Sequence, residues 1–302
     1  MATLSILHET RYAYPAPAST ARHLAYLRPL VDEAQSLGAF ELQVEPVPDE
    51  TATERDAHGN LRDRFTVLAG HRALRVRAAS TVRVQPRFAA LQPAASPAWE
   101  TVRDRLRYVA GKAYEPAVEF VQPSRFVPRL AALAELAEPL FTPGRPVAEA
   151  ALALMQHVHE VFEYLGGSTQ VDTPLAQVLG QRKGVCQDFA HVTIGALRAL
   201  GLPARYVSGY LLTEAPDSGQ AMLGADASHA WLQVWAPDTA GVPADGWLDL
   251  DPTNDCVPGT GHVRVAVGRD YGDVTPLRGV IRGGDGHTLE VAVHTQLLED
   301  AS

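Results

Sequence analysis

The segments SHAWLQVW (residues 228–235) and GWLDLD (residues 246–251) decide the fold of the C-terminal half of the chain. Both alternate in a period of two, so successive side chains point to opposite faces, as they do along a β-strand. A loop rich in Pro, Asp and Gly (236–246) lies between them. An antiparallel pair of strands is the simplest connection across such a loop.

The alternation predicts which side chains share a face. If Trp235 lies opposite Trp247, then Trp231 lies opposite Asp251, and His229 is a diagonal neighbour of Asp251. That separation suits a carboxylate that orients an imidazole. Taken singly, a strand histidine is more often a core or surface residue, and an aspartate before proline more often forms a turn.

The segment GVCQDFAH (184–191) places Cys186 in the first turn of a predicted helix that ends near Leu200. The unpaired N–H groups and the dipole of a helix N-terminus favour an anion, which makes a thiol there more nucleophilic. Gly184 would let the chain turn sharply and let a substrate approach the backbone. A lone cysteine is more often a small buried residue, so the case for catalysis depends on its partners.

Those partners are present. Cys186, His229 and Asp251 supply a nucleophile, a general base and an orienting carboxylate, in that chain order. All three in such settings are hard to explain by packing alone. The sequence therefore predicts nucleophilic catalysis by these three residues.

The order of the predicted elements indicates an α+β fold, because strands come first, helices follow, and strands return. We expect an N-terminal antiparallel β domain over residues 1–90 and a core of helices packed on an antiparallel sheet over residues 91–302. The predicted strands cover 3–14, 39–47, 61–70, 73–84, 204–213, 229–235, 246–251, 262–267 and 288–298. The predicted helices cover 98–112, 126–137, 146–164, 173–179 and 186–200.

Composition excludes several classes of protein. The chain has 302 residues, 46% hydrophobic and 20% charged, with a net charge of −9. It has no basic stripe for nucleic acid and no apolar run near the roughly 18–20 residues of a membrane span. The N-terminus lacks the features of a signal peptide, and two cysteines make no disulfide framework, so we expect a cytoplasmic protein. Oligomeric state is not predictable.

Several further blocks match a known family in order. The chain resembles the bacterial transglutaminase-like proteins, a branch of the papain-like cysteine enzymes, and the resemblance covers nearly its whole length. It rests on the core segments GVCQDFAH (184–191), RALGLPARYVSGYL (198–211), HAWLQV (229–234), GWLDLDPTND (246–255) and GRDYGDVTPLRG (268–279), with LHETRYAYPAPAS (7–19), LRP (27–29) and DAHGNLRDRF (56–65) near the N-terminus.

The resemblance implies a papain-like core in which Cys186 is the nucleophile, His229 the general base and Asp251 the residue that orients the histidine. It implies no cofactor and no metal. Asp249 departs from the glycine or uncharged residue expected at its position. In such enzymes a thiolate attacks an amide carbonyl and leaves a thioester on the enzyme.

Two reactions can follow, and the three residues cannot decide between them. Water would make the protein a peptidase or amidase, and an amine would make it a transglutaminase. We expect hydrolysis of a peptide, protein or small amide, because amine transfer requires a site that excludes water. A catalytically silent peptide-binding module is the alternative from another class.

Other residues are weaker candidates. Gly184, Trp231 and Tyr271 are candidate substrate contacts, although aromatic residues on strands are usually core. His191 lies about 1.4 helical turns beyond Cys186, so we expect it to hold its helix against neighbours. The GGDG segment (283–286) predicts a hairpin turn. Residues 1–88 contain no nucleophile–base pair, so the N-terminal domain is expected to bind a partner or restrict substrate.

Overall fold

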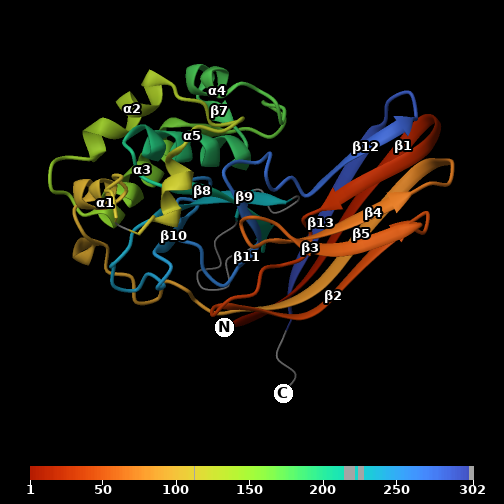
Figure 1. Cartoon of the computed structure of the whole chain (residues 1–302), viewed down its shortest axis with the longest axis horizontal. Helices are drawn as coiled ribbons and strands as arrows, with labels where there is room; N and C mark the ends of the chain where they lie inside the picture. Colours follow the sequence, from red (N-terminus) through yellow and green to blue (C-terminus); the bar gives the residue numbers. More distant parts are fainter. Residues whose placement is uncertain (112, 214–221, 224–227, 299–302) are drawn as a thin grey trace.

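The computed structural model describes residues 1–111, 113–213, 222–223 and 228–298. A large antiparallel sheet forms one part of the molecule, and a group of helices around a four-stranded sheet forms the other (Figure 1). The α+β class with this arrangement is confirmed. No helix in the described part of the chain is long and apolar enough to cross a membrane.

The large sheet is organised around one long strand. Strand β1 pairs along its first half with β5 and β13, and along its second half with β4 and β12. Strand β2 extends the sheet beyond β5, and β3, which was not expected from the sequence, extends it beyond β4. The strands are β1 Ala2–Ala25, β2 Gln35–Glu45, β3 Glu50–Arg55, β4 Leu61–Val67, β5 His71–Val84, β12 Leu277–Gly283 and β13 Thr288–Leu298.

Both ends of the chain build this sheet. We expected everything after residue 90 to belong to the core, but β12 and β13 pair with β1 instead. The hairpin expected at 283–286 is also wrong, because β12 and β13 run in the same direction along β1. The GGDG segment is a bulge between them. Gly283, Gly284 and Gly286 there have φ between 82° and 97°, a left-handed backbone that favours glycine.

The other part places helices over the four-stranded sheet, whose order is β10-β9-β8-β11. Its strands are β8 Ala204–Leu211, β9 His229–Trp235, β10 Trp247–Leu250 and β11 His262–Gly268, with the short pair β6 Glu163–Tyr164 and β7 Lys183–Gly184. Its α-helices are α1 Trp99–Arg105, α2 Ala131–Ala137, α3 Val147–Val161, α4 Leu175–Gln181 and α5 Cys186–Ala199. Short 3-10 turns are η1 Pro93–Ala95, η2 Pro116–Val121 and η3 Glu138–Leu140.

Helix α5 occupies the centre of this part. Every residue from 188 to 198 is buried, because the helix packs on β8 and β9 on one side and on α2, α3 and α4 on the other. The buried end of the large sheet, including Leu4 and Ile6 of β1, joins the same hydrophobic core. The N-terminus of α5, with the half-buried Cys186, lies at the end of this buried helix.

The predicted strand register is confirmed. Trp247 pairs with Trp235, and Asp249 pairs with Gln233. The predicted elements also occur close to where they were expected, although α1 stops at Arg105 and α2 starts only at Ala131. Strands β3, β6, β7 and β12 were not predicted.

Trp231 lies inside the molecule rather than on a groove. Its side chain is fully buried and packs with Val207, Val267 and Leu30. The ring fits because β8 has a glycine beneath it: a Cβ at Gly209 would lie 2.4 Å from the Trp231 ring and 2.2 Å from the carbonyl oxygen of Val263.

We expect Gly209→Ala to lower the free energy of unfolding by about 1–3 kcal/mol, because the added methyl group meets backbone as well as the indole. Gly70→Ala is the matched control, since no atom lies within 4 Å of the corresponding position. Urea unfolding of both variants checks the prediction. Equal stability of the two would contradict this account of the packing.

Candidate active site

Cys186 begins α5 and its side chain is half-buried. The turn before it is fixed by Asp188, whose Oδ2 accepts hydrogen bonds from the Val185 N–H (2.9 Å) and from the Thr169 hydroxyl (2.6 Å). Burial raises the pKa of Asp188, and these two hydrogen bonds oppose the rise. The carboxylate locks the loop against the first turn of the helix, so the thiol has a defined position.

Gly184 makes this lock possible. A Cβ at Gly184 would lie 2.6 Å from the Asp188 carboxylate. The absence of a side chain is therefore explained by packing. A contact between Gly184 and a substrate stays a prediction.

His229 and Asp251 meet as the register requires. His229 Nε2 lies 2.9 Å from Asp251 Oδ2, and both side chains are fully buried. The other ring nitrogen, Nδ1, has no hydrogen-bond partner among the described residues. Cys186 acts on this ring electrostatically, so the thiol, the imidazole and the carboxylate form one group.

Asp251 is held from several directions. Its Oδ1 accepts the backbone N–H groups of Thr253 (3.0 Å) and Asn254 (3.3 Å). Its Oδ2 also accepts Asn254 Nδ2 (2.8 Å) and His262 Nε2 (3.1 Å). Asp251 thus forms a turn and orients a histidine at once, so the two interpretations of this residue do not exclude each other.

The two histidines bound to Asp251 differ in charge. Burial alone would lower the pKa of His229, but the Asp251 carboxylate and the Cys186 thiol outweigh it and raise that pKa to about 10. Burial lowers the pKa of His262, and Asp251 opposes this only in part. The pKa of Asp251 is lowered, because these imidazoles outweigh the cost of its burial. The same carboxylate therefore favours the charged form of His229 more than that of His262.

His262 was missed by the sequence analysis. It lies 11 residues beyond Asp251 at the start of a predicted strand, and no local motif marks it. The donor atoms of His229, Asp251 and His262 lie within 4.8 Å of one another, a spacing that a cation could also use. The hydrogen bonds from the two histidines to Asp251 already explain these short distances. We therefore interpret the cluster as a hydrogen-bonded group and not as a cation site.

Of the aromatic candidates, Trp231 packs against this group and Tyr271 packs against His191, Phe126 and Tyr206. Trp231 stacks on His229 with ring centroids 5.9 Å apart and meets His262 edge-on at 5.3 Å, so it touches the imidazoles from the buried side. Tyr271 is half-buried, and its N–H donates to His191 Nε2 (3.2 Å). His191 also stacks on Phe126 and holds α5 as expected.

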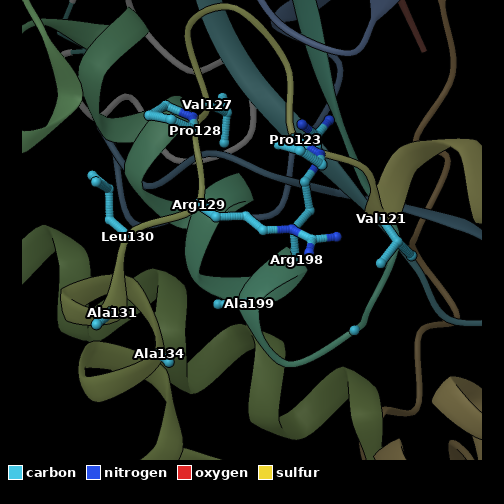
Figure 2. Close-up of a pocket in the computed structure, with 12 residues that line it drawn as sticks. Val121, Pro123, Val127, Pro128, Arg129, Leu130, Ala131, Ala134, Arg198 and Ala199 are labelled. Atoms are coloured by element: carbon cyan, nitrogen blue, oxygen red, sulfur yellow. The ribbon is translucent and has the colours of Figure 1, made fainter.

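A surface pocket of about 480 Å³ lies elsewhere on α5 (Figure 2). It is lined by Gly195, Arg198 and Ala199 from the C-terminal half of the helix, and Arg129 extends along it toward α5. Arg198 lies twelve positions after Cys186, which is about 18 Å along a helix. This pocket is therefore distinct from the group around the thiol.

Comparison with known proteins points to one family. Residues 134–252 match the profile of the transglutaminase-like superfamily, and residues 4–83 match the bacterial transglutaminase-like N-terminal region. An uncharacterized protein of Mycobacterium tuberculosis (strain H37Rv) is 38% identical over 292 residues, covering 95% of this chain and 90% of that protein. A protein-glutamine gamma-glutamyltransferase of Pseudomonas aeruginosa is 34% identical over 121 residues, covering 38% of this chain and 17% of that protein.

A solved structure supports the fold. A proposed cysteine protease from Cytophaga hutchinsonii superposes with a TM-score of 0.72 at 22% identity, over 100% of this chain and 92% of that one. At this identity the likeness concerns the fold alone. It spans both the large sheet and the part that carries Cys186.

Asp249, the residue that departs from the expected pattern, is a buried acid near the site. Burial raises its pKa to about 6, and Arg87, Gln233 and Arg205 only partly oppose this. A carboxyl whose pKa is higher in the folded than in the unfolded chain binds more protons when folded. Its contribution therefore favours folding below about pH 4 and is lost as pH rises through about 6.

We expect Asp249→Asn to raise the free energy of unfolding by about 1–3 kcal/mol at pH 8 and to change it little near pH 4. Asp245→Asn is the control, because Asp245 is a largely exposed partner of Arg87 and such pairs contribute little. Urea unfolding at the two pH values gives the comparison. A gain from Asp249→Asn that is independent of pH would contradict the assignment.

Proposed function

The chain belongs to the transglutaminase-like superfamily, and on that basis we propose that it hydrolyses amide or peptide bonds through a thioester on Cys186. The observation that carries the proposal is the His229–Asp251 hydrogen bond of 2.9 Å beside a half-buried thiol at a helix N-terminus. The substrate class is a peptide, a protein or a small amide.

The first half of the proposed reaction uses all three residues. A Cys186 thiolate, stabilised by the His229 imidazolium, attacks the amide carbon, and a carbon–sulfur bond forms as the carbonyl π bond opens to an oxyanion. When the oxyanion collapses, the carbon–nitrogen bond breaks and the leaving nitrogen takes the His229 proton. Asp251 keeps the imidazole in the orientation that both proton transfers need. The products are a free amine and a thioester.

Backbone groups are available for the oxyanion. The first hydrogen bond of α5 runs from the Asp188 N–H to the Val185 carbonyl oxygen (2.9 Å). The N–H groups of Cys186 and Gln187 therefore stand outside the helical pattern. Donors fixed in this way stabilise charge as it develops on a carbonyl oxygen.

In the second half, neutral His229 removes a proton from water, which attacks the thioester and releases an acid and the thiolate. The half-exposed position of Cys186 supports water as the acceptor. Transfer to an amine is the second candidate, because the Pseudomonas aeruginosa relative is named for that reaction. A silent binding module would not need a buried imidazole held at 2.9 Å from a carboxylate beside a thiol.

We expect iodoacetamide to alkylate Cys186 rapidly at pH 6, because the His229 imidazolium stabilises the thiolate. His229→Gln, which can keep a hydrogen bond to Asp251, should slow this reaction at pH 6 at least tenfold. Peptide mass spectrometry follows the labelling. Cys256 is an internal control, because burial raises the pKa of its thiol. Slow labelling that is unchanged in His229→Gln would contradict an activated thiol and favour the binding module.

We also expect turnover of a peptide-amide panel to release free acids at a rate that added glycine ethyl ester does not increase. Cys186→Ala, the control, should release none above background. Mass spectrometry distinguishes the acid from the amine adduct. An adduct as the main product at millimolar amine would contradict hydrolysis and establish acyl transfer.

A further inference from the structure

His262 connects the candidate site to the large sheet. It begins β11, the strand at the edge of the four-stranded sheet that lies toward the large sheet (Figure 1). One edge of β11 pairs with β8. The backbone groups on its other edge need partners, because buried amide and carbonyl groups are costly when unpaired.

A bulge sets which groups face that free edge. The pairing of β11 with β8 slips by one residue between Arg264 and Ala266. In a regular strand the outward-facing amides recur every second residue. With one extra residue inserted, Arg264 and Val267 both present their N–H and carbonyl groups outward.

Two side-chain amides from the large sheet occupy these positions. Gln35 Oε1 accepts the Arg264 N–H (2.9 Å), and its Nε2 donates to the Arg264 carbonyl oxygen (2.8 Å). Asn60 Oδ1 accepts the Val267 N–H (2.8 Å), and its Nδ2 donates to the Val267 carbonyl oxygen (2.7 Å). Each amide replaces the donor and acceptor of a missing neighbouring strand.

Both amides are themselves held firmly. Gln35 Nε2 also donates to the Leu30 carbonyl oxygen (2.7 Å), and Asn60 Nδ2 donates to Asp56 Oδ2 (2.8 Å). Gln35 and Asn60 are at most 1% exposed. Water therefore does not compete for these bonds.

We call the hydrogen bonds of Gln35 and Asn60 to β11 the clamp. The clamp lies next to the candidate active site. Gln35, Arg264, Trp231 and His262 line one small cavity. Trp231 also packs on Val267, at the second clamped position. A shift of β11 would therefore move His262 relative to the Asp251 carboxylate.

We propose that His262 is a positioning residue for the Cys186 reaction, and that the large sheet holds it in place through Gln35 and Asn60. This inference rests on the proposed function. The large sheet then takes part in positioning the catalytic residues. The sequence analysis had instead predicted that the N-terminal domain binds a partner or restricts substrate. His262 touches neither thiol nor substrate in this scheme. It fixes the Asp251 oxygen that holds the His229 imidazole.

The first test compares His262→Leu with His262→Gln, which can place an N–H near the Nε2 position. We expect His262→Leu to slow iodoacetamide labelling of Cys186 at pH 6 about 10- to 100-fold, since small displacements of a catalytic group cost rate on this scale. The fall in labelling at acidic pH should begin at higher pH in this variant. His262→Gln should restore most of the rate and the profile.

His8→Leu is the matched control. His8 is a buried histidine of β1 that contacts Thr10 and Tyr210 and no member of the candidate site. We expect its labelling profile to equal that of the unmodified protein. If His262→Leu also keeps that profile, or if His262→Gln fails to restore it while folded, His262 is not a positioning residue.

The second test addresses the clamp. Gln35→Met removes the amide at similar size, and Gln43→Met alters an exposed glutamine of the same strand. We expect Gln35→Met to shift the Cys186 profile in the same direction as His262→Leu and Gln43→Met to leave it unchanged. In the double variant Gln35→Met with His262→Leu, the labelling rate of Cys186 should fall by less than the product of the two single-variant factors, because both substitutions act through His262. Independent effects, or no effect of Gln35→Met, would overturn the role of the sheet.

Failure of the proposed function has a different signature. In that case Cys186 of the unmodified protein would label slowly and His229→Gln would not change the rate. The inference fails instead when Cys186 of the unmodified protein labels rapidly at pH 6 and the labelling rate falls in His229→Gln but does not change in His262→Leu.

Discussion

A single buried carboxylate governs the arrangement of the candidate site. Asp251 accepts hydrogen bonds from two imidazoles, two backbone amides and the side-chain amide of Asn254. A buried charge is tolerated only when it is paired and fully hydrogen-bonded. With its lone pairs engaged, the carboxylate is held in one orientation, and it fixes the His229 ring through Nε2. The surrounding elements of the site keep this carboxylate hydrogen-bonded and shielded from water.

Segments that are far apart in the sequence position the residues of the site. Packing around α5 fixes the thiol, and the β9–β10 register brings His229 to Asp251. The indole of Trp231 covers both imidazoles and needs Gly209 beneath it. The large sheet covers the free edge of β11 with side-chain amides. The sheet and the helical part also share one hydrophobic core, so the molecule behaves as one unit around the site.

Local patterns in the sequence were enough for much of this. Alternation over 228–235 and 246–251 allows Trp247 to pair with Trp231 or with Trp235. We expected the pairing with Trp235, which needs the shorter loop, and the His229–Asp251 contact follows from it. Cys186 was identifiable because a helix start is a local feature. His262 was not, since its role arises from its hydrogen bond to Asp251 and from the contact of β11 with the large sheet. The glycines at 283–286 suit a bulge as well as a turn, and only the long β1 strand, which pairs on both sides of the bulge, decides between them.

The central claim is that His229 is an imidazolium, held between the thiol of Cys186 and the Asp251 carboxylate across the neutral range. The most direct measurement is a pH titration of the His229 ring by NMR on protein with 13C-labelled histidine, assigned with His229→Gln. The account predicts that the ring stays protonated from pH 6 to pH 8.5, and that Cys186→Ala lowers its pKa by removing the facing thiol. A ring that titrates near 6.5, and is unaffected by Cys186→Ala, would contradict the account.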